Sequence, residues 1–138
     1  MKKRILFLCT GNAVRSQMSE AIARAFHSDV VEAVSAGSRP AGFVHPMAIR
    51  AMAEIGVDIS SAESKSAQRF IEETFDVVVT VCDSAAQDCP MWPGAKRLEH
   101  WPIEDPTFFG ANAEQQLARF VETRKELEGR IAELVASL

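Results

Sequence analysis

The stretch RILFLCTGNAVRSQMSEAIARAF, residues 4–26, decides the fold. Residues 4–8 form an almost wholly apolar run of the kind found in a buried β-strand. Turn-forming residues follow at 9–12, and from Ser16 onward apolar and small side chains recur at helical spacing. A strand, a loop and a helix therefore succeed one another at the start of the chain, which is typical of an α/β fold.

The rest of the chain continues this alternation. Further strands are predicted at 30–36, 75–81 and 96–100, and the second of these, FDVVVTV, has the β-branched, almost uncharged character of a fully buried strand. Further helices are predicted at 46–55, beginning at Pro46 and capped by Gly56, at 66–73 and at 112–136. The pattern predicts a parallel sheet with helices on both faces. No repeat, low-complexity segment or linker divides the sequence, so one domain, 1–138, is expected.

The bulk composition excludes several classes of protein. Hydrophobic residues make up 47% and charged residues 25%, and the formal net charge of −4 argues against a basic nucleic-acid surface. The basic N-terminus precedes an apolar run too short for a signal peptide, and no stretch approaches the length of a membrane span. A cytoplasmic protein without nucleic-acid or membrane partners is expected. Its three cysteines then indicate catalysis or metal binding rather than structural disulfides.

The first predicted loop has the form Cys-x5-Arg and consists, with the next residue, of Cys9, Thr10, Gly11, Asn12, Ala13, Val14, Arg15 and Ser16. A loop at a helix N-terminus can direct several backbone N–H groups at one tetrahedral oxyanion, and Arg15 can bind two of its oxygens. Gly11 is expected where a Cβ would clash, and Asn12 tolerates a left-handed conformation. The positive surroundings favour the Cys9 thiolate, to which Ser16 can hydrogen-bond. The residues alone also allow a buried, inert Cys9 at the end of a strand.

Cys82 and Cys89 are seven residues apart, and Cys82 follows a predicted strand just as Cys9 does. Because the carboxyl ends of parallel strands meet at one edge of a sheet, Cys9 and Cys82 are expected to lie close together. In a helix, seven residues span about 10 Å, whereas a disulfide needs Cα atoms within about 7 Å. Cys82 and Cys89 can therefore bond only if the segment between them unwinds. Two incidental thiols remain an alternative, and the spacing does not favour a zinc site.

Residues 9–20, CTGNAVRSQMSE, resemble the signature of the low-molecular-weight tyrosine phosphatases and of the thioredoxin-coupled arsenate reductases that share their fold. The resemblance covers essentially the whole chain, including residues 35–37 and the Asp105-Pro106 pair. It implies a three-layer α/β sandwich around a four-stranded parallel sheet. It also implies that Cys9 is the nucleophile, that the loop and Arg15 bind the substrate, and that Asp105 is the general acid. Without the resemblance, Asp105 would be interpreted as a turn or capping residue.

The arsenate reductases resemble this chain in having three cysteines at matching places. The resemblance implies that Cys9 attacks arsenate, that Cys82 attacks Cys9 and releases arsenite, and that Cys89 then attacks Cys82. Thioredoxin would reduce the final disulfide. No metal or organic cofactor is expected, and the chain is expected to be a monomer.

Two other functions stay open at this point. A low-molecular-weight phosphatase would hydrolyse phosphomonoesters through a Cys9 phosphocysteine, but such enzymes tend to carry tyrosines after the Asp-Pro pair, and this chain contains none. A non-catalytic oxyanion or redox sensor would use the cysteines to change conformation.

Some members of the resembled family bind potassium behind the loop. Asn12, Glu20 and Ser35 match the ligands of that site, but Lys65 stands where an aspartate is expected. We expect its ammonium group to take the place of the cation, so that activity needs no potassium. His45 is expected to be a surface or helix-capping residue.

Overall fold

Four parallel strands form the central sheet, in the order β2-β1-β3-β4. They are β1 (Lys3–Cys9), β2 (Val31–Gly37), β3 (Phe75–Thr80) and β4 (Ala95–His100). The computed structural model describes residues 2–81 and 92–138, and Cys82 and Cys89 lie outside them. All four predicted strands are present within one residue of their predicted bounds, and the parallel α/β sheet is confirmed.

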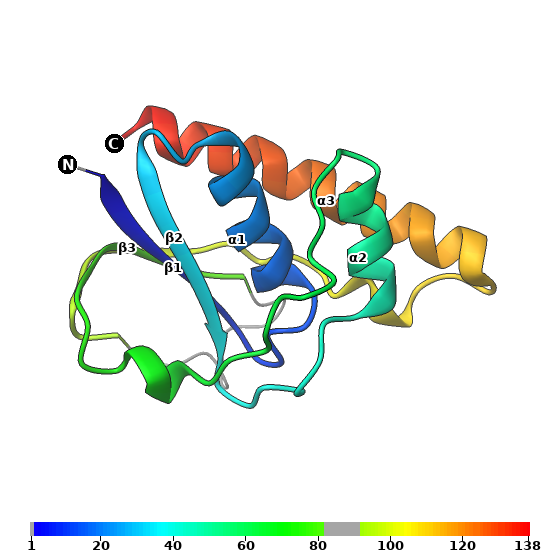
Figure 1. Cartoon of the computed structure of the whole chain (residues 1–138), viewed down its shortest axis with the longest axis horizontal. Coiled ribbons are helices and arrows are strands. Elements are labelled where there is room, and N and C mark those ends of the chain that lie inside the picture. Colours follow the sequence, from blue (N-terminus) through cyan, green and yellow to red (C-terminus); the bar gives the residue numbers. More distant parts are fainter. Residues whose placement is uncertain (1, 82–91) are drawn as a thin grey trace.

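Three α-helices cover one face of this sheet (Figure 1). They are α1 (Arg15–Phe26), α2 (Pro46–Ala53) and α3 (Ala113–Ala136), and α3 packs against both of the others. Ile5 and Phe7 of β1 belong to the hydrophobic core on this side, and both are fully buried. Alternation along the strand places Cys9 on the same face, next to the start of α1.

The opposite face is built mainly from Leu6, Leu8 and Val78, all fully buried. In the part of the chain that the structure describes, no α-helix covers it. The 3-10 helix η1 (Ala67–Phe70) and Trp92 pack there instead. Helices were expected on both faces of the sheet. On this second face, the described residues form only one short 3-10 helix.

Among the described residues, the predicted helix at 66–73 is the one clear error in the secondary structure, because only η1 forms there. Ser66 caps it by accepting a hydrogen bond from the Gln68 N–H at 3.2 Å. Ala67 is buried and Phe70 packs edge-on against Phe75, so a single turn already buries the apolar surface available. Ile71, which is 48% exposed, offers no buried face that could extend the helix.

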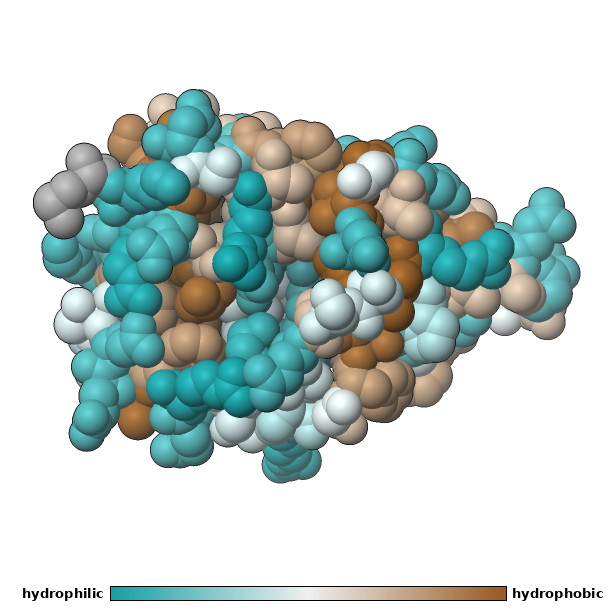
Figure 2. Space-filling view, in the orientation of Figure 1, coloured by the Kyte–Doolittle hydropathy of each residue, from teal (hydrophilic) through white to brown (hydrophobic). Residues whose placement is uncertain are grey.

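The surface is hydrophilic over much of the face seen in Figure 2, and hydrophobic residues gather mainly over α2 and the loop after it. Within the described residues, no helix is long and apolar enough to cross a membrane.

Candidate active site

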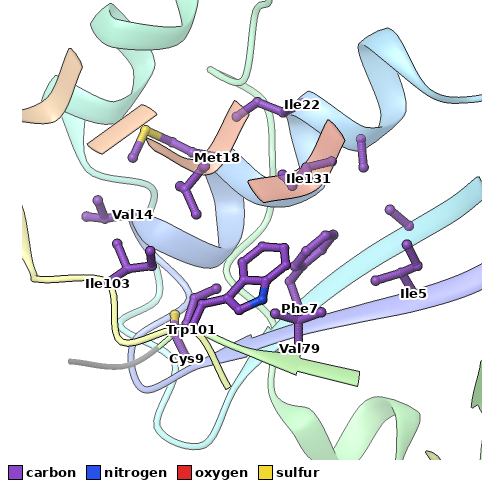
Figure 3. Close-up of a cluster of buried hydrophobic side chains, with 14 of the residues drawn as sticks. Ile5, Phe7, Cys9, Val14, Met18, Ile22, Val79, Trp101, Ile103 and Ile131 are labelled. Atoms are coloured by element: carbon purple, nitrogen blue, oxygen red, sulfur yellow. The ribbon is translucent and has the colours of Figure 1, made fainter. Parts of the chain in front are cut away.

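Cys9 ends β1 at the carboxyl edge of the sheet and is only 2% exposed. Its Sγ lies 2.8 Å from Ser16 Oγ and accepts a hydrogen bond from the Asn12 N–H at 3.2 Å. Cys9 belongs to the buried cluster on the helix side of the sheet, which also includes Val14, Trp101 and Ile103 (Figure 3). The predicted contact between Cys9 and Ser16 is confirmed.

The backbone of the loop has its carbonyl groups turned away from Cys9 and towards the segment that follows β2. Thr10 O accepts from Arg39 N at 2.9 Å, Gly11 O from Ala41 N at 2.8 Å, and Ala13 O from His45 N at 3.0 Å. These three hydrogen bonds fix the loop against the segment after β2, and the Asn12 N–H points at Cys9 Sγ on the inner side. That arrangement suits a bound oxyanion.

Asn12 holds the loop in shape. Its φ of 49° is left-handed, as expected for this residue type. Its amide group donates to Ser16 Oγ at 2.8 Å and to Ser35 Oγ at 3.0 Å, and its Oδ1 accepts from the Lys65 N–H at 2.7 Å. The loop conformation is therefore fixed by a buried side chain that reaches three separate segments.

Gly11 does not have the role that the sequence suggested. A Cβ there would meet nothing closer than 3.9 Å, so no steric clash requires glycine at this position. The glycine that does allow a close approach is Gly37, at the end of β2. A Cβ on Gly37 would lie 2.5 Å from Thr10 O and 3.0 Å from Asn12 N.

Gly37→Ala is therefore expected to push the Cys9 loop outward and to destabilise the fold by about 1–3 kcal/mol, the usual effect of overpacking. A displacement of the loop by about 1 Å is expected to lower activity about 100-fold. Urea unfolding and steady-state kinetics measure the two effects. Gly129→Ala is the matched control, since nothing lies within 4 Å of its Cβ position on α3. It should raise stability slightly, and equal effects of the two variants would contradict the argument.

Arg15 is the first residue of α1 and supplies the positive charge of the site. Its side chain is 10% exposed, and its Nη1 donates to Ile103 O at 2.9 Å. No side chain caps the start of α1, and the partial positive charge of a helix N-terminus favours an anion at this position. Arg15 and Cys9 line a cavity of about 190 Å³, whose walls also include Val14, Phe43, His45 and Asp105.

Asp105 caps a short helix and also lies in the Cys9 cavity, where a general acid is expected. It caps the 3-10 helix η2 (Pro106–Phe108), with Oδ1 accepting from the Thr107 N–H at 2.9 Å. The carboxylate also lines the cavity, and Oδ2 lies 3.7 Å from Arg15 Nη2. The cap orients one oxygen and leaves the other facing the anion site, as a general acid requires.

His45 combines a helix cap with a place in the cavity. It does cap α2, as expected, with Nδ1 accepting from the Met47 N–H at 3.0 Å. It also lines the cavity beside Cys9 and Asp105. Burial lowers the pKa of His45, and the nearby Asp105 carboxylate opposes part of that shift. Pro46 marks the start of α2, and the contact of this start with the Cys9 loop, from His45 N to Ala13 O, joins segments that no local pattern links.

Behind the loop, a buried hydrogen-bonded chain leads from Cys9 to Lys65. Ser35 Oγ donates to Glu20 Oε1 at 2.7 Å, and the same oxygen lies 3.3 Å from Lys65 Nζ. Asn12 links Ser35 to Ser16, which contacts Cys9. The structure thus brings together Asn12, Glu20, Ser35 and Lys65, and the Lys65 ammonium occupies the position facing the Glu20 carboxylate.

Lys65→Met is expected to destabilise the fold by about 2 kcal/mol, because it leaves the buried Glu20 carboxylate without its buried cation. Arg24→Met is the control on the same carboxylate, since Arg24 is 65% exposed and pairs with Glu20 Oε2 at 3.0 Å. It should cost only about 0.5 kcal/mol. Urea unfolding measures the free energy of unfolding of both variants. In the wild type, replacing sodium by potassium at equal ionic strength should leave activity unchanged, and a steep potassium activation would contradict the proposed role of Lys65.

Comparisons with known proteins agree with this geometry. The family model of the low molecular weight phosphotyrosine protein phosphatases matches residues 4–138. An arsenate reductase from Bacillus subtilis is 40% identical over 131 residues, which are 95% of this chain and 94% of the relative.

Two solved structures extend the comparison. A structure described as an arsenate reductase in the phosphate binding state superposes with a TM-score of 0.83 at 32% identity, covering 99% of this chain and 98% of that one. A thioredoxin-dependent arsenate reductase from Corynebacterium glutamicum gives a TM-score of 0.75 at 33% identity, covering 99% of this chain and 61% of that one. The chain therefore belongs to the low molecular weight phosphotyrosine protein phosphatase family, in the group whose curated members are arsenate reductases.

Proposed function

We propose that this chain reduces arsenate to arsenite by a relay of three cysteines and takes its electrons from thioredoxin, as a monomeric, single-domain cytoplasmic enzyme. The observation that carries the proposal is the buried Cys9 sulfur, held by Ser16 and the Asn12 N–H in a cavity shared with Arg15 and Asp105. The similarity to arsenate reductases over nearly the whole chain supports the choice of oxyanion.

In the first step, the Cys9 thiolate attacks arsenic(V) while the loop N–H groups and Arg15 hold the arsenate oxygens. A sulfur–arsenic bond forms, and one arsenic–oxygen bond breaks. Asp105 gives its proton to the departing oxygen, which leaves as water. The enzyme now carries a covalent thiol–arsenate adduct on Cys9, and no electron has yet been transferred to arsenic.

The second step reduces arsenic. The Cys82 thiolate attacks the sulfur of Cys9, and the electron pair of the sulfur–arsenic bond stays on arsenic, which leaves as arsenite. Cys89 then attacks Cys82 and frees Cys9, and thioredoxin reduces the Cys82–Cys89 disulfide by exchange. The hydrogen bond from Val81 N to Leu8 O, at 2.8 Å, supports the first transfer, because it holds the end of β3 beside the end of β1. The C. glutamicum relative supports the choice of reductant.

A coupled assay tests the proposal. Purified protein is combined with thioredoxin, thioredoxin reductase and NADPH, and arsenate-dependent oxidation of NADPH is followed. Steady turnover is expected, together with slow hydrolysis of small aryl phosphates, because phosphate and arsenate have similar geometry. Rapid hydrolysis of phosphotyrosine peptides without any arsenate turnover would overturn the proposal in favour of a phosphatase.

A further inference from the structure

Two helix-capping residues, His45 and Asp105, line the Cys9 cavity. Asp105 caps η2 through Oδ1, and His45 caps α2 through Nδ1. Each cap occupies one polar atom of the side chain and leaves one more for the cavity that both residues line. For Asp105 the remaining atom is Oδ2, and for His45 it is Nε2.

The cap also fixes which nitrogen of His45 carries the proton. Nδ1 accepts a hydrogen bond from the Met47 N–H at 3.0 Å, so it cannot itself be protonated while the cap is intact. The neutral imidazole therefore carries its hydrogen on Nε2. Burial favours this neutral form by lowering the pKa of His45. His45 is thus a hydrogen-bond donor, through Nε2–H, on the wall of the anion cavity.

The ring is held firmly in place. It packs against the Phe120 ring, which is fully buried on α3, with centroids 4.9 Å apart. The backbone N–H of His45 is bonded to Ala13 O, which ties the start of α2 to the Cys9 loop. A donor fixed at both its ring and its backbone is preorganised, and preorganised donors are the ones that stabilise charge during a reaction.

We propose that His45 is a positioning residue for Asp105, whose carboxylate receives a hydrogen bond from Nε2–H of His45 once Asp105 has given its proton to the leaving oxygen. The inference deepens the proposed function, since it rests on Asp105 being the proton donor. Arg15 approaches the same carboxylate, at 3.7 Å, but it must hold the substrate oxyanion during this step. A neutral donor suits the position, because it stabilises the carboxylate without adding a second positive charge that would keep Asp105 ionised from the start.

Two substitutions separate the cap from the donor. An asparagine side chain is short and caps helices well, so His45→Asn keeps the Nδ1 function and loses the Nε2–H. A glutamine side chain reaches farther, so His45→Gln places an amide donor near the Nε2 position and loses the cap.

If His45 positions Asp105, His45→Asn should lower kcat for aryl phosphate hydrolysis about 10- to 100-fold at nearly unchanged KM, the effect of losing one hydrogen bond to a charged group. Its urea midpoint should stay near that of the wild type. His45→Gln should show the lower urea midpoint and the higher kcat of the two. A merely structural His45 predicts the reverse order of kcat, with activity following stability, and that result would overturn the proposal.

A double variant checks the route through Asp105. In an Asp105→Asn background, His45→Asn should have little further effect on kcat, because the group that it serves is gone. An undiminished effect would show that His45 acts elsewhere. Aryl phosphate is used because its hydrolysis needs neither Cys82 nor Cys89. If the proposed arsenate relay proves wrong, the kcat comparison of the His45 and Asp105 variants on aryl phosphate is therefore still valid.

A readout without turnover completes the test. The imidazole ¹⁵N resonances of His45 should show the Nε2–H tautomer and should shift in Asp105→Asn. Asp58→Asn is the control, since Asp58 bonds Ser60 N at 2.8 Å in an exposed turn and does not line the cavity. Equal spectra for the two aspartate variants would rule out the contact between His45 and Asp105.

Discussion

Cys9→Ser is expected to abolish arsenate reduction and aryl phosphate hydrolysis together, each by about 10⁴-fold or more. A serine hydroxyl is not ionised near neutral pH, and among the described residues that line the cavity only Asp105 and His45 are bases that could take its proton. The residual rate would come from binding alone. Steady-state kinetics with both substrates measure the loss.

The fold should survive this substitution. A hydroxyl at position 9 can keep the partners of the sulfur, which are the Ser16 hydroxyl and the Asn12 N–H. The urea midpoint should therefore change little. Ser16→Ala is the comparison, because it removes one partner of the sulfur and leaves the nucleophile, and it should cost much less activity. Persistent hydrolysis by Cys9→Ser, with only arsenate reduction lost, would mean that another group attacks the phosphate ester.

The sequence was sufficient for the sheet and the long helices because their signals are local. Residues 75–81 are almost purely β-branched and apolar, and the apolar positions of 112–136 repeat at helical spacing. The helical pattern of residues 66–73 is weaker, and packing against the sheet determines how much of this segment becomes helical. Ala67 and Phe70 reach the second face of the sheet within a single 3-10 turn, so no longer helix forms.

The site was only partly predictable, because some of its contacts join residues that are far apart in sequence. Cys9, Arg15, Asn12 and Ser16 lie within one loop and helix start, so their spacing alone could place them together. The close approach of Gly37 to Thr10 O joins segments 27 residues apart, and no local pattern marks it. Pro46 predicts a helix cap at His45, but the cavity that His45 lines also includes Asp105, which is 60 residues away in sequence.

Cys89→Ser is expected to release about one arsenite per enzyme molecule and then to stop. In the proposed relay, Cys82 can still attack Cys9 and reduce arsenic, but no third thiol then frees Cys9. The product should be a protein that carries a Cys9–Cys82 disulfide, seen by mass spectrometry as the loss of two hydrogens. Arsenite measured directly should appear as a single burst that consumes no NADPH, and the coupled assay should show no steady NADPH oxidation.

Cys82→Ser is the matched control, and it separates the order of the relay from a general need for thiols. Without Cys82 the adduct on Cys9 cannot be resolved, so no arsenite should be released at all. Both variants keep Cys9, Arg15 and Asp105, so before exposure to arsenate they should hydrolyse aryl phosphate at close to the wild-type rate. Several arsenite molecules per Cys89→Ser enzyme would show that an external thiol can resolve the first disulfide. In that case the attack of Cys89 on Cys82 would not be the step that frees the Cys9 thiolate.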